Sequence, residues 1–282
     1  MNEKLRNCAL LMDGKSYESW NHLKTADVEN YKKAQQYPEL LDKLIKKKIK
    51  KGAVKHLGEN KPEGITVNPI GIAYPESENP RLVTGLKINK VCRNLSASLD
   101  HLGKILPNLY DANWQWKQDI KSCYDQISLS NNSQLLCGFK HKNQYYVFSR
   151  LPFGWAPAPY CVQFLFGQVK RYLRAKGFDI SQYIDDFHNA ESTEERATQA
   201  YKLFKSSMSR LGVLLGADKD SGVTQSLSFL GLDIDLKEKS VSGHRKLLKM
   251  RNEGWFLERQ TWSRNCLERL CGKLSINFRR LK

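Results

Sequence analysis

Two adjacent carboxylates, Asp185 and Asp186, lie between apolar residues in the segment YIDDF. Like charges side by side repel each other, and the apolar neighbours predict that the pair is partly buried. A divalent cation would relieve both costs, and carboxylate oxygens are hard ligands that suit Mg²⁺. Many Asp-Asp pairs are exposed turn residues, so the doublet alone leaves a metal site and a solvated turn as open alternatives.

A third carboxylate, Asp119, favours the metal alternative. The alternation in WQWKQDI predicts a strand that places Asp119 and Ile120 on opposite faces. One carboxylate from a strand and a doublet from a hairpin could hold two metal ions ~4 Å apart, the geometry that activates an attacking oxygen and stabilises a leaving phosphate. The remaining acids of this region are expected to be surface or turn residues: Asp125, Asp218, Asp220, Asp233 and Asp235.

The charge of the chain indicates a partner for such a site. The 46 Lys and Arg outnumber the 29 Asp and Glu, so the formal net charge is +17. This excess predicts a polyanionic partner, because each phosphate that a basic residue neutralises releases a counterion. A basic protein without a nucleic-acid role is the alternative that charge alone leaves open.

Other classes of protein are disfavoured. No uninterrupted run of 18 apolar residues could span a bilayer, and the apolar stretch at the N-terminus ends too early for a secretory signal. The seven scattered cysteines are not a disulfide framework, and Cys266 and Cys271 lack the partners of a zinc site. We therefore expect an intracellular protein of the cytoplasm or nucleus with no membrane contact. The chain also lacks a P-loop motif.

Short helices and hairpins should position the acids. Residues 38–49 predict a basic helix that Gly52 ends, and residues 91–115 are expected to be mainly helical. Apolar segments around ESENP and around residues 141–144 predict two hairpins. Irregular alternation of strands and helices predicts an α+β class with an antiparallel sheet.

The later part of the chain carries three further helical patterns. Pro159 opens a helix with an apolar face, and Ser192 with Glu195 forms a capping-box pattern at the start of another. The second of these helices is expected to keep an apolar register up to Leu211 and to end at Gly212. SLSFLGLDIDL predicts strands, and residues 244–282 predict two basic helices.

The motifs QDIKSCYDQISL, LPFGWAPAPYCVQ, YIDDF and FLGLDID stand in the order and spacing of the reverse transcriptases of retrotransposons. The LPFG form most resembles LTR-type and DIRS-type elements, and the resemblance covers about residues 38–235. It implies a right-hand polymerase, with fingers, an antiparallel palm sheet and a partial thumb. One segment departs from the family, because TGLKIN has Gly85 and Lys87 where relatives carry Asp-x-Arg.

The resemblance implies a role for each acid. Asp119, Asp185 and Asp186 match the metal ligands, and Ile120 would add its backbone carbonyl. The cofactors would be two Mg²⁺ ions, with Mn²⁺ as an alternative. Lys219 matches a lysine that can protonate pyrophosphate, although a lone turn lysine is more often solvated. Phe229, Leu230 and Gly231 would form the primer grip.

The resemblance also implies a nucleotide-binding pocket. Tyr124 matches an aromatic residue under the sugar, where it would exclude a 2′-hydroxyl, and an ordinary core tyrosine is the alternative. Phe153 and Gly154 would lie against the incoming nucleotide, Gln163 would face template or nucleotide, and Arg81 would meet the triphosphate.

The implied domain limits are a basic helical lead-in (1–60), fingers (61–115), a palm with an inserted fingers hairpin (116–236) and the start of a thumb or connection (237–282). The implied reaction is addition of dNTPs to a primer 3′-hydroxyl on an RNA or DNA template. Two alternatives remain. One is a catalytically silent, retroelement-derived nucleic-acid-binding protein, and the other is an RNA-synthesising polymerase, which Tyr124 disfavours.

Overall fold

The computed structural model describes residues 28–90, 99–100 and 102–243. The chain divides into two compact units, each of which is described by itself. Unit 1 comprises Met1–Ser98 and Ser122–Leu165, and unit 2 comprises Leu99–Lys121 and Phe166–Lys282. The helices expected at 244–282, and with them most of the expected thumb, lie outside the described residues. The expected domain limits stay a prediction.

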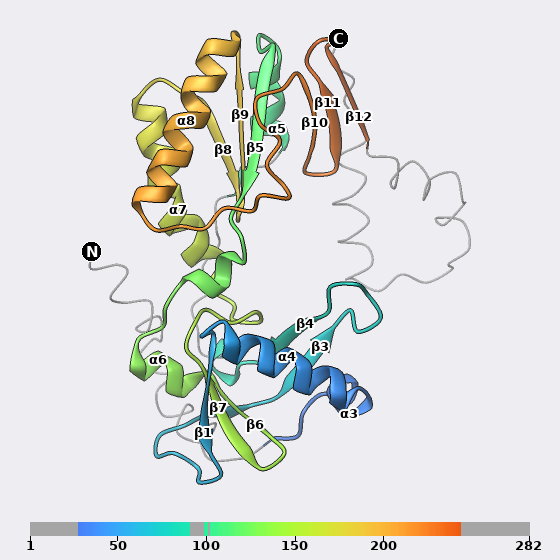
Figure 1. Cartoon of the computed structure of the whole chain (residues 1–282), viewed down its shortest axis with the longest axis vertical. Coiled ribbons are helices and arrows are strands. Elements are labelled where there is room, and N and C mark those ends of the chain that lie inside the picture. Colours follow the sequence, from blue (N-terminus) through green and yellow to red (C-terminus); the bar gives the residue numbers. More distant parts are fainter. Residues whose placement is uncertain (1–27, 91–98, 101, 244–282) are drawn as a thin grey trace. The chain divides into compact units, whose positions relative to one another are not determined.

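A mixed sheet and a hairpin form the body of unit 1 (Figure 1). The sheet has the order β1-β7-β6-β2, and only the β2–β6 pair is parallel. A second antiparallel pair joins β3 to β4. The elements are α3 (Lys32–Gln36), α4 (Pro38–Lys50), β1 (Val54–Gly58), β2 (Val67–Asn68), β3 (Ile70–Ala73), β4 (Arg81–Thr84), η2 (Lys87–Lys90), η4 (Cys123–Gln126), α6 (Asn131–Leu136), β6 (Gly138–His141) and β7 (Gln144–Phe148).

The predicted helix and hairpins of unit 1 are confirmed, but the lead-in expected to be helical up to residue 60 contains strand β1. Helix α4 buries Leu41, Leu44 and Ile45 and is followed by Gly52, whose φ of +65° is the left-handed conformation that ends helices. Lys142 and Asn143 join β6 to β7 with φ values of 48° and 58°, so both central residues have the positive φ of a type I′ hairpin turn.

Two antiparallel sheets form unit 2, with the orders β5-β9-β8 and β10-β11-β12. Helix α7 crosses the division between the units along the chain. The elements are α5 (Leu102–Ile105), η3 (Leu106–Leu109), β5 (Trp114–Asp119), α7 (Ala158–Ala175), β8 (Ile180–Tyr183), β9 (Asp186–Glu191), α8 (Glu194–Arg210), β10 (Ser226–Phe229), β11 (Leu232–Asp235) and β12 (Ser240–Gly243).

Helix α8 packs against the β5-β9-β8 sheet (Figure 1), and aromatic rings form part of that contact. Phe204 of α8 lies 5.1 Å from Trp116 of β5 and 4.9 Å from Phe187 of β9, measured between ring centroids. All three side chains are fully buried. Because they alternate with polar residues along β5 and β9, the strand residues between them face the opposite side of the sheet.

Several local predictions need correction. Helix α8 is capped by Thr193, which accepts from the Arg196 N–H, and not by Ser192. Thr193 is also a good capping residue and follows directly, so the helix begins one residue later than the capping box implied. Leu211, which was expected to lie on the apolar face of this helix, is 63% exposed. In the described part of 91–115 only α5 and the short η3 are helical.

The predicted fold class, α+β with antiparallel sheets, is confirmed. Among the helices that the structure describes, none combines the length and the apolar composition needed to cross a bilayer.

Candidate active site

Strand pairing brings two of the three predicted acids together in unit 2. In the antiparallel register of β5 and β9, Asp119 lies directly opposite Asp186. The turn between β8 and β9 consists of Ile184 and Asp185, and the Ile120 N–H donates to the Asp185 carbonyl oxygen at 3.0 Å. The end of one strand and the turn of a hairpin therefore meet, and a joint site of all three acids stays a prediction.

Asp119 is held in a tight and nearly dry position. Its residue is 7% exposed, and one carboxylate oxygen, Oδ2, accepts from the Lys219 ammonium at 2.9 Å. The other, Oδ1, has no hydrogen-bond partner among the described residues. The Gly216 N–H donates to the Asp119 carbonyl oxygen, and a Cβ built on Gly216 would lie 2.1 Å from Oδ1. Any larger residue at 216 would therefore force this carboxylate to move.

The electrostatics of the cluster favour a bound cation. Burial raises the pKa of Asp186 above its usual value, and the negative charge of Asp185 raises it further, while Lys219 opposes both. The hydrogen bond to Asp119 raises the pKa of Lys219, so its ammonium stays charged. Lys219 supplies the positive charge that a buried carboxylate requires. The structure thus places this predicted lysine against the acids.

A cavity of about 180 Å³ opens beside these groups. It is lined by Lys117, Gln118, Asp119, Asp186, Lys219, Ser228, Phe229 and Leu230. Leu230 and Gly231 form the β10–β11 turn, with positive φ values of 48° and 80°. The segment that the family resemblance identified as a primer grip therefore borders the same cavity as the acids.

The carboxylates are ligands of the type that Mg²⁺ prefers, although their side chains do not surround one common point. Within the described residues, no three His, Cys, Asp or Glu side chains surround a common point. Carboxylate oxygens are the ligands that Mg²⁺ takes from proteins, together with water and substrate phosphates. The unpaired Oδ1 of Asp119 and the raised pKa of Asp186 mark positions where a cation would relieve a cost.

The predicted nucleotide residues gather separately, within unit 1. The rings of Tyr124 and Phe153 lie 4.6 Å apart between centroids, and the Arg81 guanidinium lies 5.5 Å from the centre of the Phe153 ring. Gly154 has a φ of +107°, and a Cβ there would lie 1.9 Å from the Thr84 carbonyl oxygen. The loop and the β3–β4 hairpin are thus packed together as closely as glycine allows. Gln163 is half-buried in α7.

Sequence reasoning missed two residues that hold this cluster. The Asn89 side chain donates to the Gly154 carbonyl oxygen at 2.6 Å and accepts from the Ala156 N–H at 2.9 Å. Lys48 of α4 forms an ion pair with Asp125, next to Tyr124, and its ammonium lies 5.7 Å from the Phe153 ring centre. Nothing local marks either contact, because each joins segments far apart in the sequence.

The segment that departs from the family pattern is tied down by backbone contacts. The Gly85 N–H donates to the Pro69 carbonyl oxygen, and the Lys87 N–H donates to the Asn68 side chain at 2.8 Å. A Cβ on Gly85 would lie 1.9 Å from the Tyr31 hydroxyl oxygen. The absence of a side chain at Gly85 therefore leaves the space that the Tyr31 hydroxyl occupies.

His188, two residues after the doublet, is buried and held neutral. Burial lowers its pKa to about 3, and nearby Lys117 acts in the same direction. Its Nε2 lies 3.0 Å from the Gln115 side-chain oxygen, and its ring stacks on Phe229 at 4.8 Å. His188 therefore packs β9 against β10, to which Phe229 belongs.

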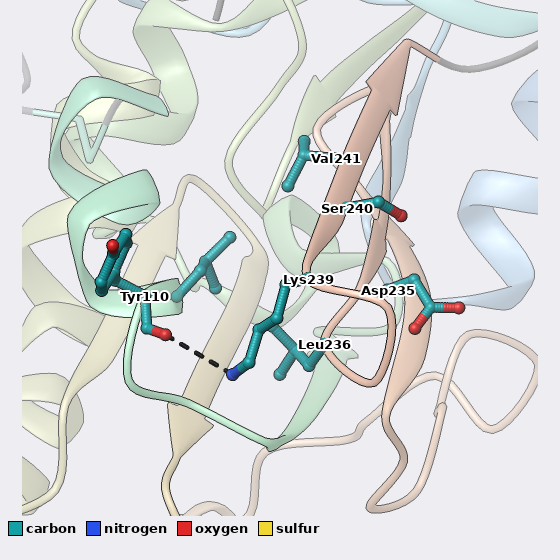
Figure 2. Close-up of a pocket in the computed structure, with 7 residues that line it drawn as sticks. Tyr110, Asp235, Leu236, Lys239, Ser240 and Val241 are labelled. Carbon is teal, nitrogen blue, oxygen red and sulfur yellow. Dashed lines mark hydrogen bonds between the residues drawn. The ribbon is translucent and has the colours of Figure 1, made fainter. Parts of the chain in front are cut away.

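A second cavity, of about 280 Å³, contains none of the predicted site residues (Figure 2). It lies along the β11–β12 hairpin and is lined by Leu109, Tyr110, Asp235, Leu236, Lys239, Ser240 and Val241. Lys239 reaches across it to the carbonyl oxygens of Tyr110 and Ala112. These bonds tie the hairpin to the segment that leads into β5.

Residues 76–234 match the family described as reverse transcriptase (RNA-dependent DNA polymerase). Among curated proteins, none matches the chain significantly. Solved structures of the foamy viral protease-reverse transcriptase share the fold. Its complex with dsDNA in the dRH form gives a TM-score of 0.70 at 17% identity, covering 90% of this chain and 42% of that one. Its complex with an RNA/DNA hybrid gives 0.67 at 19% identity, covering 89% and 33%.

These likenesses confirm the predicted right-hand polymerase fold. A further dsDNA complex of the foamy viral protein gives a TM-score of 0.66 at 17% identity and covers 90% of this chain and 50% of that chain. The chain spans half or less of the length of these proteins. The assignment to an LTR-type or DIRS-type element stays a prediction.

Proposed function

The chain belongs to the reverse transcriptase (RNA-dependent DNA polymerase) family, and we propose that it extends a primer with deoxynucleotides as the polymerase of a retrotransposon. The primer 3′-hydroxyl would lose its proton to solvent and its oxygen would bond to the α-phosphorus of a dNTP while the bond from that phosphorus to pyrophosphate breaks. The observation that carries the proposal is the register that places Asp119 opposite Asp186, with Lys219 beside them.

Asp119, Asp185 and Asp186 would hold two Mg²⁺ or Mn²⁺ ions, and Ile120 would add its carbonyl oxygen. In extended backbone the N–H and C=O of one residue point to the same edge, and the Ile120 N–H points to Asp185. When bound, such ions lower the pKa of the attacking hydroxyl and stabilise the charge on the phosphates. Lys219 would move from Asp119 towards the departing pyrophosphate and donate a proton to it.

The cluster of unit 1 would select and hold the nucleotide. Tyr124, fixed against Phe153, would exclude a 2′-hydroxyl, and the Arg81 fork would pair with triphosphate oxygens. Gly154 would let the backbone approach the nucleotide, and Gln163 would face the template or the base. The template with its primer would be RNA or DNA, bound through the basic excess of the chain.

Primer extension on a homopolymer template tests the proposal. The wild-type chain should incorporate dNTPs only with Mg²⁺ or Mn²⁺, whereas Asp185→Asn should lose roughly 10³-fold or more of the rate because a metal ligand is gone. Template–primer affinity should stay within about twofold, since Asp185 opposes rather than attracts the phosphates. A wild-type chain that binds template–primer tightly but extends no primer would instead support a silent nucleic-acid-binding protein.

A further inference from the structure

The turn that carries the acidic doublet is strained. Ile184 has a φ of +56°, a left-handed conformation that β-branched residues rarely adopt. Such a residue persists only where its surroundings hold it. The position of Asp185 and Asp186 therefore depends on whatever fixes Ile184.

Two hydrogen bonds hold this turn from opposite sides. The Ile120 N–H of the chain following β5 donates to the Asp185 carbonyl oxygen at 3.0 Å. The Gln182 side-chain amide of β8 donates to the Ile184 carbonyl oxygen at 2.9 Å. Gln182 is fully buried, so water does not compete for this bond.

Asp100 forms two hydrogen bonds with the backbone of Gln182. Strand β8 is an edge of its sheet, and the outward backbone groups of Gln182 need partners there. The Gln182 N–H donates to Asp100 Oδ2 at 2.9 Å, and the Asp100 N–H donates to the Gln182 carbonyl oxygen at 3.3 Å. Lys170 of α7 forms an ion pair with the same Asp100 oxygen, and both side chains are largely buried.

We propose that Gln182 and Asp100 are positioning residues that hold the strained Ile184–Asp185 turn, and through it the two carboxylates, in the geometry that binds the catalytic cations. Neither side chain is among the proposed metal ligands. Asp100 is neutralised by Lys170, so the pair adds no net charge. The effect is mechanical: without the Gln182 amide, the turn relaxes from its left-handed conformation and the carboxylates rotate away.

The proposal rests on the proposed function, but Mn²⁺ binding tests it without turnover. Gln182→Met keeps the length of the side chain and removes the donor. Mn²⁺ affinity, measured from the free-ion signal in electron paramagnetic resonance, and kcat should each fall roughly 10-fold to 100-fold, the usual effect of losing a residue that orients metal ligands. The KM for dNTP and the template–primer affinity should change less than about twofold, because no contact to either is altered.

Asn189→Leu is the matched control. Asn189 is equally buried, on β9, and its amide donates to the Asp179 carbonyl oxygen and to Glu191, at the opposite end of the strand from the doublet. It should lower the melting temperature while Mn²⁺ affinity and kcat stay near wild type. Wild-type Mn²⁺ affinity in Gln182→Met, or an equal loss in Asn189→Leu, would overturn the proposal.

Asp100→Asn provides a second test if Gln182→Met fails to fold. It retains an oxygen for the Gln182 N–H but removes the charge that fixes Lys170, and it should weaken Mn²⁺ binding in the same direction by a smaller factor. Unchanged Mn²⁺ affinity in this variant would refute the role of Asp100. A wild-type chain that binds Mn²⁺ through Asp185 yet extends no primer would refute the polymerase and leave the positioning role to be judged on Mn²⁺ affinity.

Discussion

The acids of unit 2 and the aromatic cluster of unit 1 are held in different ways. Asp119 and Asp186 face each other because two paired strands fix their backbones, and a slip of one strand by one residue would turn its carboxylate to the other face of the sheet. Tyr124, Phe153 and Arg81 lie on a 3₁₀ turn, a loop and a strand end, where side chains such as Asn89 and Lys48 hold them. The proposed metal site should therefore tolerate few changes, while the proposed nucleotide cluster should change its selectivity gradually.

The largest effect is expected at Gly216, which lies against the Asp119 carboxylate. Gly216→Ala would place a Cβ 2.1 Å from Asp119 Oδ1, so the carboxylate must move. A displacement of about 1 Å at a reacting centre can cost roughly 10²-fold in rate, and we expect a loss of that size in kcat with Mg²⁺.

Gly167→Ala in α7 is the control for this change. Its Cβ would lie 3.5 Å from the Gln182 side-chain oxygen, an ordinary van der Waals contact that leaves the hydrogen bond from the Gln182 amide to Ile184 in place, and alanine favours helix. It should leave kcat near wild type. Equal rates for the two alanine variants in single-turnover primer extension would show that the Asp119 carboxylate is not fixed as the structure indicates.

Tyr124→Val tests the selectivity of the nucleotide cluster. Removal of the ring should leave space for a 2′-hydroxyl and raise the ratio of ribonucleotide to deoxynucleotide incorporation by roughly 10-fold to 100-fold, the range that one pocket contact can discriminate. The rate with dNTPs should fall much less than in Gly216→Ala. Competitive incorporation of dGTP and GTP measures the ratio, and an unchanged ratio would assign Tyr124 to the core instead of the gate.

Lys48→Ala should have the smallest effect. Its ion pair with Asp125 is partly exposed, so its loss should loosen Tyr124 and Phe153 only slightly and raise the KM for dNTP by roughly twofold to fivefold. Lys51, which is more exposed and lies 3.8 Å from the other Asp125 oxygen, is the matched control. Steady-state kinetics should show a smaller change for Lys51→Ala. If Lys48→Ala instead lowers kcat as strongly as Gly216→Ala does, the contrast between the two regions fails.

Local patterns predicted much of the fold and the identity of the acids. The helix from Pro38 and the turn at Lys142 and Asn143 follow from nearby residues, and YIDDF marks itself by two charges between apolar neighbours. The start of α8 was missed by one residue because Ser192 and Thr193 can each cap a helix.

Contacts between distant segments could not be predicted in the same way. A single sequence does not show that Gln182 is buried rather than exposed, or that its amide reaches Ile184. The approach of Lys219 to Asp119 depends on how the loop after α8 returns to β5, and the ion pair of Lys48 with Asp125 depends on the packing of α4. Such polar contacts depend on tertiary structure, which local hydrophobic periodicity does not predict.

The central claim is that Asp119, Asp185 and Asp186 converge on divalent cations. Anomalous diffraction from crystals of the wild-type chain grown with Mn²⁺, template–primer and a dNTP tests it directly. The account predicts anomalous peaks within coordination distance of all three carboxylates and of the nucleotide phosphates, with no such peaks in Asp185→Asn. Anomalous density that avoids Asp119, or that binds elsewhere with the nucleotide in place, would contradict it.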